Sequence, residues 1–253
     1  MHESSLKRMR WFKERYMDQA GKYKVLDVGS YNVNGCYKEI FEEDNIKYHG
    51  LDMEHGPNVD IVPKMAYKWE EIIDDSYECV ISGQALEHIE FFWITVAEMI
   101  RVTKKNGLIC IIAPNGFQEH RYPVDCWRFF TDGMIALARY YQLDVIHAHT
   151  NAAPTLEEVG WYSSDCADSM LIARKAYSGK ARITDLSVYK CRPADQDKVM
   201  GDMIKYEVYE QMIKKTKAEM EEKKIIPEPR IRKKIKNTKR FIKELLSRYK
   251  KDD

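Results

Sequence analysis

Apolar residues recur along the chain as short runs separated by longer mixed stretches, from about residue 24 to residue 174. This rhythm is typical of a sheet whose strands alternate with helices. The run 108–113 is apolar without interruption, as expected of a parallel strand buried on both faces. Seven strands are therefore predicted near residues 25–29, 48–52, 59–62, 78–82, 108–113, 143–147 and 169–173.

Helical periodicity separates several of these strands. Apolar positions between residues 91 and 102 recur at helical spacing, residues 132–142 have a helical pattern, and a first helix is expected to begin at Tyr37. The predicted architecture is an α/β fold with a mostly parallel seven-stranded sheet and helices on both faces. Residues 1–21 form an N-terminal helix, 22–177 the main domain, and 178–253 a helical C-terminal extension.

Composition fits a globular protein, since 44% of the 253 residues are hydrophobic and 32% are charged. No apolar run is long enough for a membrane-spanning helix, and the first residues lack the apolar core of a signal peptide. We expect a cytoplasmic protein, with peripheral contact at the inner face of the membrane as a further option.

Charge is distributed unevenly. Residues 223–251 contain 13 Lys and Arg but only two Glu, whereas the whole chain has a net charge of +1, so the remainder is acidic. Residues 231–249 combine an apolar stripe with basic faces, which fits a helix that contacts anionic lipid, packs on the acidic body or binds nucleic acid. The acidic body argues against nucleic acid as a partner, and a homodimer stays open.

The six cysteines are scattered without a C-x-x-C pair, and two of them, Cys79 and Cys110, lie in predicted core strands. Buried reduced thiols are therefore expected rather than a zinc site. The histidines show no spacing typical of a ligand set. The sequence accordingly predicts no bound metal.

A candidate cofactor site follows the first strand. Gly29 permits a close approach of the backbone to a ligand, and Gly35 follows a short loop. The loop is not G-x-G-x-x-G, because Tyr31 and Val33 replace glycines, so a cofactor without a pyrophosphate is favoured. Asp52, at the end of the second strand, could accept two hydrogen bonds from the hydroxyls of a ribose. Alternatively, Gly29 only turns the chain and Asp52 only caps a loop.

An ordered set of motifs carries a family resemblance: VLDVGS (25–30), NG (34–35), GLDM (50–53), PNVDIV (57–62), VISGQALEHIE (80–90) and NGLICIIAP (106–114). Together they resemble the class I S-adenosylmethionine-dependent methyltransferases, which have a Rossmann-like fold. A segment like HRYPVDCWRFFTDGM (120–134) is similar to bacterial members associated with surface polysaccharide biosynthesis. The resemblance covers residues 22–175 and departs from the commoner D-x-G-x-G-x-G at Tyr31 and Val33.

The resemblance implies S-adenosylmethionine as cofactor and S-adenosylhomocysteine as product, and it assigns cofactor residues. Asp27, Gly29 and Ser30 would line the methionine moiety, with Gly35 in the same loop. Asp52 would hold the ribose, and Met53 would pack on the adenine unless it only fills the core. Gly83 and Gln84 would lie beside the sulfonium.

Two groups of residues could act on the acceptor. Glu87 and His88 follow Gln84 closely, and as neighbours on a helix they are not expected to share one face. The segment after residue 114 is expected to bind the acceptor. In it, His120 is the preferred general base, with His88 or Glu87 as alternatives. Asp125 would orient His120 or accept from a sugar hydroxyl. Arg121 or Arg128 would bind a phosphate or carboxylate, Tyr122 would contact the substrate, and an Asp125–Arg128 ion pair is the structural alternative.

These observations predict an O-methyltransferase that acts on a sugar hydroxyl, of a nucleotide-activated or phosphorylated sugar in capsule or surface polysaccharide biosynthesis. The first alternative is another small acceptor, either a nitrogen or a phosphate-derived oxygen. RNA methylation and a non-catalytic binding protein with the same fold are the others.

Overall fold

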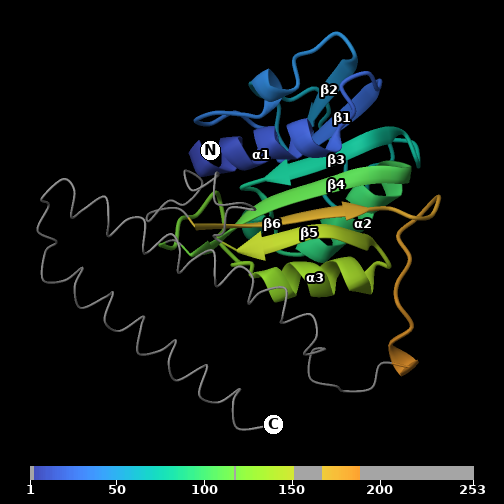
Figure 1. Ribbon diagram of the computed structural model, residues 1–253. Coiled ribbons are helices and arrows are strands. Elements are labelled where there is room, and N and C mark those ends of the chain that lie inside the picture. Colours follow the sequence, from blue (N-terminus) through green and yellow to red (C-terminus); the bar gives the residue numbers. More distant parts are fainter. Residues whose placement is uncertain (1–2, 117, 151–166, 189–253) are drawn as a thin grey trace, which may run out of the picture. The chain divides into compact units, whose positions relative to one another are not determined.

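In the computed structural model, which describes residues 3–116, 118–150 and 167–188, a six-stranded sheet forms the centre of the domain (Figure 1). The strands are β1 (Tyr23–Val28), β2 (Ile46–Leu51), β3 (Tyr77–Gly83), β4 (Thr103–Gly116), β5 (Asp144–Thr150) and β6 (Ala167–Arg174). Their order is β2-β1-β3-β4-β6-β5. Only β6 runs antiparallel to its neighbours, so the sheet is mixed and mostly parallel, as predicted.

Helices cover both faces of the sheet. The long helices are α1 (Glu3–Tyr16), α2 (Phe92–Val102) and α3 (Thr131–Tyr140). Strand β4 shows why two layers form: Ile109, Ile111 and Ala113 pack in one hydrophobic cluster with α2 and α3, whereas Leu108, Cys110 and Ile112 pack in another with α1. Alternate side chains of a strand point to opposite faces, so an uninterrupted apolar run fills both clusters.

Two predicted elements differ in the structure. Residues 59–62 form no strand of the sheet; Ile61 makes one isolated parallel bridge to Leu51. The amides of Asp60 and Ile61 both donate to the Gly50 carbonyl oxygen, and Pro63, which has no amide hydrogen, follows directly. Within the described part of the chain the sheet has six strands, so the prediction of a seventh strand at residues 59–62 is wrong.

The first predicted helix is also much shorter than expected. In its place lies η1 (Lys38–Ile40), a single 3-10 turn held by hydrogen bonds from Ile40 to Tyr37 and from Phe41 to Lys38. The chain turns again at Glu43 and enters β2 at Ile46, which leaves no length for further helical turns. The crossover from β1 to β2 therefore holds one 3-10 turn and no α-helix.

Residues 178–188 continue the domain beyond its predicted end. The Gln142 side chain donates to the Ile183 carbonyl oxygen, and the Thr184 amide donates to that of Tyr140. The only helical turn here is η4 (Leu186–Val188). The rest of the predicted helical extension, including the basic residues 231–249, falls outside the described residues. None of the described helices combines the length and apolarity needed to span a bilayer.

Candidate functional site

The turn after β1 packs directly against the segment after β3. Gly29 has a φ of +81°, and a Cβ atom built on it would lie 2.3 Å from the Cβ of Ala85. The amides of Gly29 and Ser30 both donate to the carbonyl oxygen of Leu51, at 2.9 and 3.1 Å. The ends of β1, β2 and β3 are therefore joined at the carboxyl edge, where ligands bind in open α/β sheets.

Asp27 is buried at the end of β1, with 2% of its surface exposed. Burial raises the pKa of its carboxyl to about 7, against the lowering effect of a hydrogen bond from the Tyr48 hydroxyl. That hydroxyl lies 2.5 Å from Asp27 Oδ2 and also accepts from the Asn58 side chain. Tyr48, which the sequence did not single out, is thus the residue that holds Asp27.

Asp52 and Met53 lie at the end of β2. Asp52 accepts hydrogen bonds from the amides of Tyr31, at 3.0 Å, and Met53, at 2.7 Å. Asp52 thus caps the loop, which is one of the two roles expected from the sequence. Each carboxylate oxygen still has a second lone pair that could accept a hydrogen bond from a ribose hydroxyl, and this role is a proposal. Met53 is 62% exposed, so the alternative that it fills the core is wrong.

The other predicted cofactor residues have clear structural partners. Ser30 Oγ donates to the Asn58 carbonyl oxygen, and the Gly35 amide donates to the Asn32 side chain. A Cβ at Gly83 would lie 1.9 Å from the Tyr37 hydroxyl oxygen, so glycine makes room for that buried ring. Gln84 donates from Nε2 to Asp168 Oδ1 at 2.9 Å. Tyr37 and Asp168 complete this edge, and no local signal in the sequence marked either of them.

In the segment after β4, Asp125 and Arg128 form an ion pair. Arg128 donates from two guanidinium nitrogens to the two carboxylate oxygens, at 2.5 and 2.7 Å, and the Asp125 side chain is 2% exposed. This pair holds the pKa of Asp125 well below its usual range. The His120 amide also donates to Asp125, at 2.8 Å. The Asp125–Arg128 ion pair that the sequence offered as an alternative is therefore formed. A contact between Arg128 and the substrate is a separate proposal.

The remaining residues of this segment lie at the surface. Arg121 pairs with Glu119, and both side chains are largely exposed. Tyr122 is 63% exposed, and its ring centroid lies 6.5 Å from that of His88. Tyr122 is thus open to an acceptor beside the histidines, whereas Arg121 shows no contact with them.

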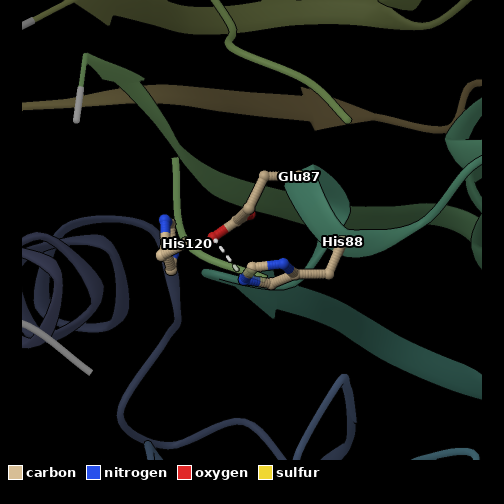
Figure 2. A group of neighbouring side chains, drawn as sticks. All are labelled: Glu87, His88 and His120. Atoms are coloured by element: carbon tan, nitrogen blue, oxygen red, sulfur yellow. Dashed lines mark ion pairs between the residues drawn. The ribbon is translucent and has the colours of Figure 1, made fainter. Parts of the chain in front are cut away.

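Glu87, His88 and His120 converge in one group, which we call the Glu-His-His cluster (Figure 2). One ligand atom from each residue lies within 4.8 Å of the others. Glu87 and His88 belong to the 3-10 turn η2 (Leu86–His88), and Glu87 Oε1 lies 3.7 Å from His88 Nε2. The expectation that these neighbours cannot share a face is wrong, because they lie on a tight turn and not on a regular α-helix.

Burial shapes the ionisation of this cluster. It raises the pKa of Glu87 to about 8 and is the main cause that lowers the pKa of His88 below its ordinary value. His88 Nδ1 lies 2.6 Å from the Val124 carbonyl oxygen, and the rings of His88 and His120 are 4.9 Å apart. A neutral imidazole close to neutral pH can accept a proton or bind a cation. The cluster therefore offers both of these chemistries three residues beyond Gln84.

The sequence predicted no metal because its histidines show no ligand spacing. The structure brings His120, from the loop after β4, to a glutamate and a histidine in the turn after β3. The motif EH at 87–88 was visible, but its partner is far away in the sequence. Only the fold places the third residue.

No protein-family model matches the sequence, and no curated protein matches it either. Solved structures do match. A putative methyltransferase from Bacillus halodurans C-125 is 14% identical, with a TM-score of 0.51 over 69% of this chain and 100% of that chain. A 1,6-didemethyltoxoflavin-N1-methyltransferase from Burkholderia thailandensis, solved with S-adenosylhomocysteine, is 13% identical, with a TM-score of 0.51 over 69% of this chain and 80% of that chain.

The [4+2]-cyclase SpnF is similar to the same degree, with 16% identity and a TM-score of 0.51 over 67% of this chain and 80% of that chain. At such identities the likeness concerns the fold alone. The chain has the Rossmann-like fold of the class I S-adenosylmethionine-dependent methyltransferases, as the sequence predicted. Because one of these structures is named as a cyclase, the activity has to be argued from the site.

Proposed function

We propose that this protein is an S-adenosylmethionine-dependent O-methyltransferase that acts on a sugar hydroxyl, of a nucleotide-activated or phosphorylated sugar in surface polysaccharide biosynthesis. The observation that carries the proposal is the position of the Glu-His-His cluster. Glu87 and His88 lie three and four residues after Gln84, in a turn that follows Ala85, the residue packed against Gly29. A group able to activate a hydroxyl thus follows immediately on the residues expected beside the sulfonium.

The chain's own residues fit the cofactor. Gly29 keeps the turn after β1 free of a side chain, and Asp52 presents a carboxylate at the end of the neighbouring strand. Met53 is exposed beside it, as contact with an adenine requires. When bound, S-adenosylmethionine supplies an activated methyl group, so the protein mainly has to align the acceptor and assist the loss of its proton.

Residues after β4 would position the acceptor. His120 is held at its amide by Asp125, and its Nδ1 lies 3.4 Å from the same carboxylate. His120 or His88 would accept the proton of the attacking hydroxyl, with His120 preferred. The exposed ring of Tyr122 offers an apolar face for a sugar. The resemblance of residues 120–134 to polysaccharide-associated enzymes supports the carbohydrate part of the proposal.

Two measurements test this function. Calorimetry with S-adenosylhomocysteine should give one site, and Asp52→Ala should weaken it by about tenfold or more, as expected for loss of a hydrogen-bonded charged group. Incubation with S-adenosylmethionine and a panel of nucleotide sugars, followed by mass spectrometry, should show the mass gain of one CH2 group in a sugar.

Other acceptors are distinguished by the same experiment. Transfer only to a nitrogen or a phosphate-derived oxygen would replace the sugar, in keeping with the N1-methyltransferase among the similar structures. Transfer to RNA would require a basic face that the acidic body does not favour. Cofactor binding without transfer to any acceptor would indicate a binding protein or another reaction on this fold.

A further inference from the structure

Glu87 carries the most unusual polar group of the Glu-His-His cluster. The residue is 1% exposed, and neither of its carboxylate oxygens has a hydrogen-bond partner in the structure. His88 Nε2 lies 3.7 Å from Glu87 Oε1. Buried polar groups are almost always satisfied, and an exception calls for a ligand, a water or an ion. Here the unsatisfied oxygens lie beside two imidazole rings, and imidazole is a group that commonly binds metal ions (Figure 2).

We propose that Glu87, His88 and His120 bind a divalent cation. One carboxylate and two imidazoles form a donor set suited to Mn2+, Fe2+, Co2+ or Zn2+, with positions left open for other ligands. Three donors that each lie about 2.1 Å from one ion in a tetrahedral arrangement are about 3.4 Å apart. The three ligand atoms lie within 4.8 Å of one another, so side-chain movements of about 1 Å would close the cluster around the ion.

The surroundings of both histidines fit this role. His88 Nδ1 lies 2.6 Å from the Val124 carbonyl oxygen, an acceptor that requires the hydrogen on Nδ1 and leaves the lone pair on Nε2. Nε2 is the atom near Glu87. His120 Nδ1 lies 3.2 Å from the Gln118 carbonyl oxygen and 3.4 Å from Asp125 Oδ2. A metal-binding histidine commonly donates its other ring hydrogen to a carbonyl or carboxylate, which orients the ring.

Cation binding by itself is independent of the proposed function. Only the role of the cation in activating the acceptor hydroxyl rests on that function. A cation with three protein ligands keeps open positions, where the acceptor hydroxyl would bind. The bound hydroxyl would release its proton to water, its oxygen would form the bond to the methyl carbon, and the electron pair of the broken S–C bond would stay on sulfur. With the cation bound, His88 and His120 serve as ligands, and the cation takes over the activation assigned above to an imidazole.

The test is binding of Mn2+ to the full-length protein, first freed of metal with a chelator. Mn2+ is chosen because the exposed thiol of Cys126 competes poorly for it. Free Mn2+ is measured by electron paramagnetic resonance during titration. One Mn2+ per chain should bind, and Glu87→Gln, His88→Ala and His120→Ala should each weaken binding by about tenfold or more.

Matched controls lie outside the cluster. Glu90→Gln removes an exposed carboxylate three residues from Glu87, and His55→Ala removes an exposed imidazole, and both should bind Mn2+ like the unmodified protein. Thermal unfolding checks that each variant is folded. If Glu87→Gln does not fold, His120→Ala still decides the question, because His120 is a partly exposed loop residue whose replacement should leave the fold intact.

No binding by the folded protein at about 1 mM Mn2+ would overturn the inference, as would equal binding by the cluster variants and the controls. Calorimetry with S-adenosylhomocysteine is run on the same samples. Cofactor binding without Mn2+ binding rejects the cation and leaves the methyltransferase proposal intact. Mn2+ binding lost in the cluster variants, without cofactor binding, supports the cation and counts against the methyltransferase.

Discussion

Two buried carboxylates lie near the same edge of the sheet, Asp27 at the end of β1 and Glu87 in η2, and their surroundings differ. Both are at most 2% exposed, and burial raises the pKa of both, to about 7 and about 8. Asp27 has the Tyr48 hydroxyl at 2.5 Å, whereas both oxygens of Glu87 lack a hydrogen-bond partner.

The difference indicates that Asp27 is a structural residue with its hydrogen-bond partner in place, whereas Glu87 belongs to a site that a ligand would complete. Tyr48 belongs to the strand beside β1, so the partner of Asp27 is fixed by the sheet itself. Glu87 has no such partner among the described residues and faces two imidazoles from a turn and a loop. We infer that Asp27 mainly shapes the cofactor edge, whereas Glu87 is completed by something that binds.

The largest expected effect is the pH dependence of stability at Asp27. Its folded-state pKa, about 7, lies above the value of about 3.9 in unfolded chains, so the folded state binds this proton more tightly. The stabilisation is fully present below about pH 4 and is lost as the pH rises through about 7, by up to about 4 kcal/mol. In Asp27→Asn this contribution should disappear from urea unfolding measured between pH 4 and pH 8, and the pH dependence that remains should be that of other groups such as Glu87.

Asp44→Asn is the matched control, because Asp44 is exposed on the same domain. It should keep the pH dependence of the unmodified protein. An Asp27→Asn variant whose stability falls with pH as steeply as that of the control would show that Asp27 is ionised in the fold at little cost.

Next in size is the contact between the two regions, at Gly29. Gly29→Ala introduces a Cβ 2.3 Å from that of Ala85 and adds a side chain at a φ of +81°. Overpacking and the left-handed conformation together should lower the free energy of unfolding by about 3 kcal/mol. Adding Ala85→Gly should remove the steric clash and recover that part of the lost stability. The cost of the left-handed conformation, about 1–2 kcal/mol, should remain. Equal stability of the single and double variants would mean that the turn after β1 moves away from η2.

His120→Ala tests the role of the Glu-His-His cluster through its effect on catalytic turnover. Loss of the group that activates the hydroxyl should slow turnover by about 100-fold, equivalent to about 2.7 kcal/mol. The affinity for S-adenosylhomocysteine should change little, because the residues expected to bind it lie at the Asp27 side. Single-turnover assays and calorimetry measure the two quantities, with His55→Ala as control. A joint loss of affinity and turnover would place His120 with the cofactor instead.

The smallest effect is expected for Tyr48→Phe, which removes the hydrogen bond to Asp27 and leaves the ring. Stability near pH 7 should fall by about 1 kcal/mol, the net value of one such bond. The carboxyl pKa should rise further, because the hydrogen bond lowers it now. Tyr31→Phe, at an exposed ring, should change neither quantity. A Tyr48→Phe variant with unchanged pH dependence would show that burial alone sets the pKa of Asp27.

Much of the fold could be read from the sequence, because the signal is local. The apolar run of β4 and the helical spacing of α2 each appear at the predicted place. Two crossover elements could not be read in the same way. Residues 37–41 have apolar positions that suit a helix, yet β2 begins too soon after them. Residues 59–62 have a strand-like pattern, yet they only fold back on Gly50.

The candidate site divides along similar lines. Gly29, Asp52 and Gly83 could be placed at one edge, since they end strands that were expected to run parallel. The role of Gly83 in making room for Tyr37 could not, because it depends on a ring that a distant segment delivers. For Arg128 the sequence left two options open, a substrate contact and an ion pair with Asp125, and the structure forms the ion pair.

By itself the sequence determined where the six strands of the sheet lie, which positions along them are buried and which residues end them, because hydrophobic periodicity and turn chemistry act over a few neighbours. Tertiary structure alone decided which buried carboxylate gained a partner. Asp27 met the Tyr48 hydroxyl across the sheet, whereas Glu87 met two histidines where a turn and a distant loop converge. Such meetings depend on long-range packing, which fixes distances that no local pattern contains.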